Sequence, residues 1–160
     1  MLQASWAAGS DRHLTTRVER SALVPHSARQ MYELVNDVER YPEFLKWCAG
    51  SELLSTQGDE LTARLDMRLA GLEQSFSTHN YNVPGEEIRI ELLDGPFSQL
   101  EGTWTFKQLG EEGSRVTLRM DFEFASPLDI VLTAAFEKLA DRMVDDFVAR
   151  AKVVYGPGPS

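Results

Sequence analysis

A series of strands with alternating apolar and polar residues, followed by one long amphipathic stretch, constrains the fold of this chain more than any other feature. The clearest alternation spans residues 115–124, where every second side chain is apolar. A period of two places these side chains on one face of a β-strand. Similar runs occupy residues 61–69, 88–92 and 100–106, and a less regular, more polar run occupies residues 73–82, with turn residues between them. Because such short connections join antiparallel neighbours, the pattern predicts an antiparallel meander.

The first third of the chain predicts one further strand and two helices. Residues 15–24 have a mainly apolar face that Arg20 interrupts. Ser27 is a suitable N-cap for a helix that ends near residue 36, because its hydroxyl can accept a hydrogen bond from a free backbone N–H. A second, short helical turn is expected over residues 38–44.

The last predicted element is a helix from Pro127 to about Val154, with Ser126 as its N-cap and Asp129 near the positive end of its dipole. Its apolar residues recur at helical spacing: Leu128, Val131, Leu132, Ala135, Leu139, Met143 and Phe147. The simplest way to bury this stripe is to pack it against the apolar face of the sheet. We therefore predict an α+β domain over residues 15–156, in the order strand, two helices, six strands and long helix. Residues 1–14 are predicted to be a disordered extension and residues 157–160 a loose tail.

The charge balance argues against a domain that binds nucleic acid through its phosphates. The 160 residues carry a formal net charge of −9, and the basic residues form no stripe along the sequence. We therefore expect no DNA partner. No run approaches the roughly 20 apolar residues that span a bilayer, and the N-terminus lacks the pattern of a secretory signal. A cytoplasmic location is the resulting expectation.

The sequence contains no motif of a catalytic or metal site. No GxSxG, HExxH, Walker A or GxGxxG pattern occurs. The one cysteine, Cys48, lies beside Trp47, where a small buried hydrophobe is expected. His79 lies on a predicted strand, and Thr78 and Asn80 project from the opposite face, so at most one of these sets lines a pocket. We expect no catalytic residue, no metal and no enzymatic activity.

Three segments resemble one branch of a known superfamily. Residues 41–48, YPEFLKWC, resemble the YPxFLPWC motif of the coenzyme Q-binding and RatA-type family, although Lys46 stands where proline is usual. Residues 95–104, GPFSQLEGTW, resemble the GPFxxLxGxW motif of the same family, and the end of the last helix is also similar. The resemblance covers about residues 15–156. It implies the helix-grip fold of the START-like (SRPBCC, Bet v 1-like) superfamily, a curved antiparallel sheet of about seven strands around a long C-terminal helix.

The resemblance implies three different functions. Bacterial members are described as oligoketide cyclase or lipid-transport proteins, mitochondrial relatives are associated with coenzyme Q binding and respiration, and the RatA type is described as a toxin that blocks ribosomal subunit association. We expect foremost a carrier or chaperone that needs no cofactor, holds ubiquinone or another polyprenyl lipid as its ligand, and touches the inner membrane transiently. The alternative is a RatA-type toxin that binds the large ribosomal subunit, and a polyketide cyclase-like enzyme is the weaker alternative.

The expected ligand cavity lies between the sheet and the last helix. Aromatic side chains and methionine suit a flexible isoprenoid chain, and hydroxyl or amide groups could meet quinone carbonyls. The expected cavity residues are Phe44, Trp47, Leu69, Phe76, Thr78, Asn80, Leu100, Trp104, Phe122, Phe136, Leu139, Met143 and Phe147. The ribosome alternative would instead use the exterior, where Arg64, Arg68, Arg115 and Arg119 project from polar faces. Pairing with neighbouring acids is the simpler expectation for these arginines.

Overall fold

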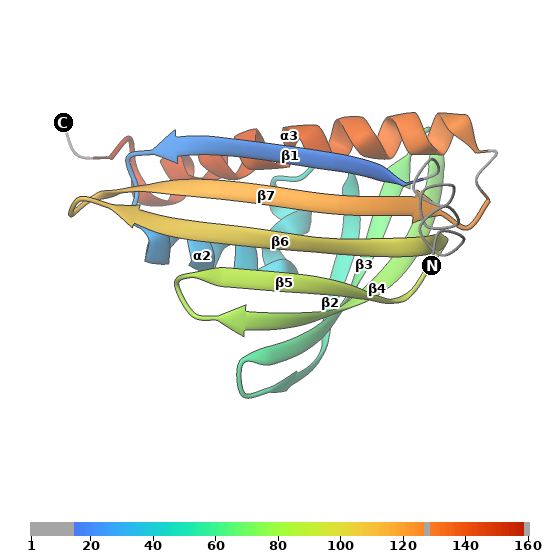
Figure 1. Ribbon diagram of the computed structural model, residues 1–160, viewed down its shortest axis with the longest axis horizontal. Coiled ribbons are helices and arrows are strands. Elements are labelled where there is room, and N and C mark those ends of the chain that lie inside the picture. The colour runs from blue at the N-terminus through green and yellow to red at the C-terminus, as the bar shows by residue number, and fades with distance from the viewer. Residues whose placement is uncertain (1–14, 127–128, 159–160) are drawn as a thin grey trace, which may run out of the picture.

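The computed structural model describes residues 15–126 and 129–158, so the predicted extension at residues 1–14 and the last two residues of the predicted tail lie outside the described residues. Seven antiparallel strands form one sheet in the order β1-β7-β6-β5-β4-β3-β2. The elements, in chain order, are β1 (Thr16–Val24), α2 (Ala28–Asn36), the 3-10 helix η1 (Val38–Glu43), β2 (Cys48–Gln57), β3 (Glu60–Leu69), β4 (Leu72–Val83), β5 (Glu87–Asp94), β6 (Phe97–Leu109), β7 (Gly113–Phe124) and α3 (Ile130–Tyr155). The sheet curves around α3, which runs beside β1 (Figure 1). The predicted α+β helix-grip fold and its element order are confirmed.

The concave face of the sheet follows directly from the alternation in the sequence. In the β6–β7 pair, Trp104 lies opposite Leu118 and Phe106 lies opposite Val116. All four side chains are buried. Burial of such side chains, at about 25 cal/mol per Å² of apolar surface, is the main force that holds the sheet against the helices.

The helix α2 and the 3-10 helix η1 close one end of the concave face. Ser27 caps α2 as predicted, since its Oγ accepts from the Gln30 backbone N–H at 3.1 Å while Gln30 Oε1 accepts from the Ser27 N–H at 2.9 Å. In η1, which contains Pro42, the Tyr41 hydroxyl donates to the Val35 carbonyl of α2. The hydrogen bond ties η1 to the end of α2.

The helix α3 begins later than the sequence predicted. Asp129 is its N-cap, with Oδ1 accepting from the Leu132 N–H at 3.1 Å. The prediction of Ser126 as the N-cap was therefore wrong, because an aspartate caps as well as a serine and the helix starts only after Asp129. Residues 127–128 lie outside the described residues.

The apolar stripe of α3 is buried along most of its length. Val131 is 66% exposed, whereas the side chains of Leu132, Phe136, Leu139, Met143 and Phe147 are buried. Within the described residues, no helix combines the length and apolar content needed to cross a bilayer.

Arg20, the polar exception on the inner face of β1, reaches the exposed side of α3. Its guanidinium lies 2.8 Å from Asp141 and 3.8 Å from Asp145. Because β1 is an edge strand, a long side chain there can pass the margin of the core and keep its charge in water. The exception in the alternation thus becomes a link between the sheet edge and the helix.

Candidate ligand-binding site

A small apolar cavity, here called the inner cavity, lies between α3 and the concave face of the sheet. Its volume is about 50 Å³. Such a space has room for a few water molecules, whereas pockets for drug-sized ligands measure roughly 300–1,000 Å³. In this conformation, the inner cavity therefore has no room for a quinone ring with a polyprenyl chain.

A second hollow, here called the mouth, adjoins the inner cavity at the surface. Its volume is about 280 Å³, and its lining residues are Phe44, Lys46, Trp47, Leu69, Ala135, Lys138, Leu139, Arg142 and Asp146. Trp47 and Leu139 line both spaces, so these two side chains form the wall between them. The site therefore has a nearly filled apolar interior and an accessible, partly charged entrance.

The structure brings most of the predicted cavity residues together. Nine of them line the inner cavity: Trp47, Phe76, Thr78, Asn80, Leu100, Trp104, Phe136, Leu139 and Met143. Phe44 and Leu69 line the mouth. Phe122 and Phe147 line neither space, because each ring is fully buried against other aromatic rings. The centroid of Phe122 lies 4.7 Å from that of Phe136, and the centroid of Phe147 lies 5.3 Å from that of Trp104.

Sequence reasoning missed several lining residues of both spaces. The inner cavity is also lined by Val38, Tyr41, Ala63, Leu65, Ile90 and Met120. Four of these six lie on strands, on faces that the alternation already predicted to be apolar, so that signal was available. The charged lining of the mouth had no comparable signal, because Lys46 follows η1 whereas Lys138, Arg142 and Asp146 lie on α3, about 90 residues later.

One buried polar pair faces the inner cavity. Thr78 and Asn80 alternate along β4, and the Thr78 hydroxyl donates to Asn80 Oδ1 at 2.9 Å. His79 projects from the other face, where its Nε2 lies 2.8 Å from Glu60 Oε1 and its ring stacks on Tyr81 with centroids 4.4 Å apart. The alternation along β4 therefore excludes His79 from the cavity that Thr78 and Asn80 line.

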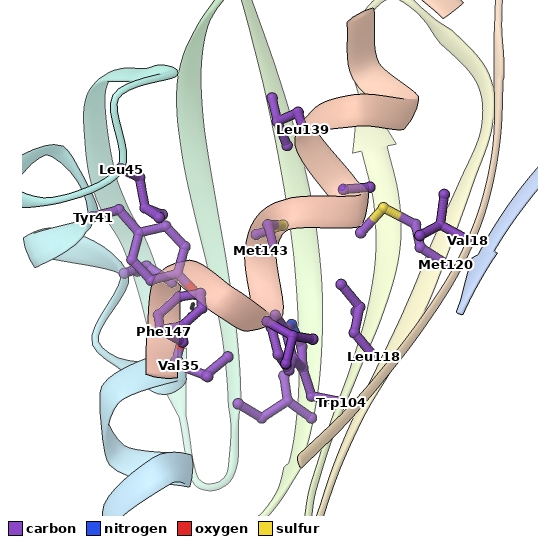
Figure 2. Close-up of a cluster of buried hydrophobic side chains, with 14 of the residues drawn as sticks. Val18, Val35, Tyr41, Leu45, Trp104, Leu118, Met120, Leu139, Met143 and Phe147 are labelled. Carbon is purple, nitrogen blue, oxygen red and sulfur yellow. Dashed lines mark hydrogen bonds between the residues drawn. The ribbon is translucent and has the colours of Figure 1, made fainter. Parts of the chain in front are cut away.

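Aromatic rings pack around Phe147, two turns after Leu139 on α3. Figure 2 shows Leu139, Met143 and Phe147 on successive turns of α3, with Phe147 near Tyr41. The Phe147 centroid lies 5.4 Å from that of Tyr41 and 5.3 Å from that of Phe44, both in edge-to-face geometry. Phe147 itself lines neither space, and this packed cluster around it, which shares Phe44 with the mouth, is here called the closed end.

The mouth carries an excess of positive charge. Lys46, Lys138 and Arg142 are exposed, and within the described residues none of them forms an ion pair. Asp146 is the one carboxylate in the lining, and burial raises its pKa while the charges of Arg142 and Lys46 oppose that rise. A carboxylate, sulfate or phosphate group would meet three free cations here.

No serine, cysteine or histidine among the described residues lines either space. Cys48 is buried and lines neither space, and burial raises the pKa of its thiol to about 11, so it holds its proton at neutral pH. Across residues 15–126 and 129–158, no three His, Cys, Asp or Glu side chains gather closely enough to hold a metal ion. The arrangement is suited to holding a ligand.

The exterior arginines form no common patch. Arg64 pairs with Asp66 at 3.0 Å, as expected, and also with Glu52, whereas Arg68, Arg115 and Arg119 form no ion pair within the described residues. Arg68 lies on the same strand, β3, whereas Arg115 and Arg119 lie on β7. Strands β4, β5 and β6 separate β3 from β7 in the sheet. The four arginines therefore belong to two distant parts of the outer face.

The chain matches the polyketide cyclase/dehydrase and lipid transport family over residues 24–148. It belongs to this family. Among its relatives in the family is the ribosome association toxin RatA of Pseudomonas aeruginosa, 44% identical over 144 residues that cover 89% of this chain and all of the relative. RatA of Escherichia coli is 43% identical over 87% of this chain and 89% of that protein. A more distant relative, the mitochondrial coenzyme Q-binding protein COQ10 homolog B of Xenopus laevis, is 30% identical over 85% of this chain and 58% of its own length.

Solved structures agree with the fold of this family. An aromatase/cyclase from a Streptomyces species superposes with a TM-score of 0.79 at 20% identity, covering 91% of this chain and 99% of the other. An 18 kDa protein of Caulobacter crescentus superposes with a TM-score of 0.66 at 28% identity, covering 88% and 99%. The first likeness, at 20% identity, concerns the fold alone.

Proposed function

We propose that this protein is a RatA-type toxin that binds the large ribosomal subunit and hinders its association with the small subunit. The observation that carries this function is the 43–44% identity to two proteins named ribosome association toxin RatA, over nearly the whole domain. The protein would act in the cytoplasm by binding the large subunit, and it would need no cofactor.

The role expected foremost from the sequence, a polyprenyl quinone carrier, has weaker support. It rests on the more distant relative whose name includes coenzyme Q binding. A carrier needs an apolar space that matches its ligand, and the inner cavity measures about 50 Å³. Quinone binding would therefore require the wall at Trp47 and Leu139 to open, together with further expansion of the core.

The proposed function is tested by sedimentation of the labelled chain with purified ribosomal subunits of Pseudomonas aeruginosa. We expect the chain to move with the large subunit and not with the small one. An unrelated acidic protein of similar size serves as the control for nonspecific attachment. If the chain stays at the top of the gradient with both subunits, while added ubiquinone binds in a one-to-one ratio, the carrier role replaces the ribosomal one.

A further inference from the structure

We propose that the mouth is a binding site for a small anionic amphiphile, a molecule with one acidic head group and a short apolar chain. The cations Lys46, Lys138 and Arg142 would hold the head group, and the apolar floor of the mouth would hold the chain. The site goes beyond the ribosomal function, and binding at the mouth can be measured in the absence of ribosomes.

The charge of the mouth differs from that of the rest of the protein. The chain as a whole carries a formal net charge of −9, yet the lining of the mouth has three cations and one carboxylate. Most arginines elsewhere pair with acids, for example Arg17 with Asp121 at 2.7 Å. The three cations of the mouth have no such partner within the described residues, so an incoming anion would break no existing ion pair.

The floor of the mouth is apolar and concave. Phe44, Leu69 and Ala135 line it together with Trp47 and Leu139 of the wall. Its volume of about 280 Å³ is close to the lower bound, roughly 300 Å³, of pockets for small molecules. The long side chains of lysine and arginine can lie along such a floor and still place their charges at the rim. A ligand that fits the mouth places its apolar part in the hollow and its charged group at the rim.

The two aromatic side chains of the mouth are held differently. Phe44 is covered by the guanidinium of Arg150, 4.8 Å from the ring centroid, and Arg150 is itself bound to Glu43 at 2.8 Å. Trp47 has a buried indole Nε1 without a hydrogen-bond partner in the described part of the chain. Turning the Trp47 side chain would therefore break no hydrogen bond, and it would join the mouth to the inner cavity.

Ribosomal RNA is the other polyanion that three cations could meet. RNA-binding surfaces that contact phosphates spread their basic residues along a groove or face, whereas these three surround a hollow with an apolar floor. A hollow of this kind gives an alkyl chain apolar surface to bury, and a phosphate backbone has no such chain. The shape of the mouth thus favours the amphiphile over RNA.

Three probes with apolar chains of similar length and different head groups test the site, each titrated below its aggregation concentration and followed by calorimetry. The probes are decanoate, decanol and decyltrimethylammonium. We expect decanoate to bind in a one-to-one ratio and at least tenfold more tightly than either of the others. Equal affinity for all three, or no binding of decanoate, would overturn the site.

Matched variants locate the binding. The double variant K138Q/R142Q should weaken decanoate binding at least tenfold. K107Q/R115Q is the control, because it removes two exposed cations that lie opposite each other on β6 and β7, away from the mouth, and it should leave binding unchanged. A135W should abolish binding by filling the hollow, and its thermal melting curve checks that the fold persists.

Two further outcomes separate this site from the ribosomal function. If wild type does not bind ribosomal subunits but decanoate binds as expected, the ribosomal function fails and the mouth stands. If K138Q/R142Q loses binding to the large subunit but keeps its affinity for decanoate, the cations contact RNA and the amphiphile site is wrong.

Discussion

The closed end and the mouth are built by the same helix against the same sheet, yet they differ in packing. At the closed end, Phe147 is 0% exposed and lies in edge-to-face contact with three other aromatic rings. At the mouth, two turns earlier in α3, Leu139 is 9% exposed and separates two spaces. The apolar face of α3 therefore stabilises the fold at the closed end and borders an open hollow at the mouth.

The difference shows how a helix-grip domain combines stability with an accessible site. The closed end is completed by α2 and η1, which bring Val35 and Tyr41 against Phe147 (Figure 2). Among the described residues, the segment after η1 reaches the mouth through Phe44, Lys46 and Trp47, and Leu69 of β3 also lines it. Because fewer side chains surround the mouth, a substitution there should affect stability less and binding more.

The largest expected effect of a substitution is at the closed end. Phe147→Ala should lower the free energy of unfolding by about 3–5 kcal/mol, because it removes a ring that is packed on all sides. Leu139→Ala should lower it by about 2 kcal/mol, the small end of the range for such truncations, since Leu139 already borders empty space. Urea unfolding of both variants measures the difference. Equal losses would contradict the contrast between the two ends.

The next effect concerns the polar pair of the inner cavity. Thr78→Val keeps the side-chain volume but removes the donor to Asn80 Oδ1, and should lower the free energy of unfolding by about 1–2 kcal/mol. The double variant Thr78→Val with Asn80→Leu should lose less than the sum of the two single losses, because no acceptor is then left without its donor. Strict additivity in urea unfolding would show that the pair is not coupled.

The smallest effect is the pH dependence contributed by the mouth. Burial raises the pKa of Asp146 in the folded state, so the folded chain binds more protons than the unfolded one between the ordinary carboxyl pKa of about 3.9 and the raised value. The Asp146 contribution to stability is therefore most favourable below this window and falls as pH rises through it. Asp146→Asn should be more stable than wild type at pH 7, by less than about 1 kcal/mol because the group is only partly buried.

The comparison of thermal melting curves of wild type and Asp146→Asn at pH 7 and at pH 3.5 tests this sign. The advantage of the variant should be much smaller at the lower pH, where the wild-type carboxyl is mostly protonated in both states. A variant that is less stable than wild type at pH 7 would mean that the attraction of Arg142 and Lys46 outweighs the burial of the carboxylate.

Most strands and helices could be predicted from the sequence, because alternation and short turns are local signals. The period of two along β7 predicted its buried face, and Ser27 predicted the start of α2. The start of α3 was harder to place, because Ser126 and Asp129 are both good caps and only the tertiary packing selects between them. Local signals therefore located every strand except β2, for which no run was identified, and they were ambiguous at one boundary.

The candidate site was less accessible to sequence reasoning. The alternation placed Thr78 and Trp104 on the inner face, but it carried no information on how tightly the rings would pack, and the inner cavity is much smaller than a quinone requires. The charged rim of the mouth joins Lys46 to Lys138 and Arg142 across the sequence, so only the folded chain brings these cations together.

The central claim, that this chain hinders the association of ribosomal subunits, is tested most directly by light scattering. Purified small and large subunits of Pseudomonas aeruginosa are mixed at a magnesium concentration that favours association, with increasing amounts of the folded chain. We expect the scattering increase to diminish with dose and to saturate near one chain per large subunit, with no effect of the unfolded chain. An unchanged scattering increase at a severalfold excess of the folded chain would contradict the proposed function.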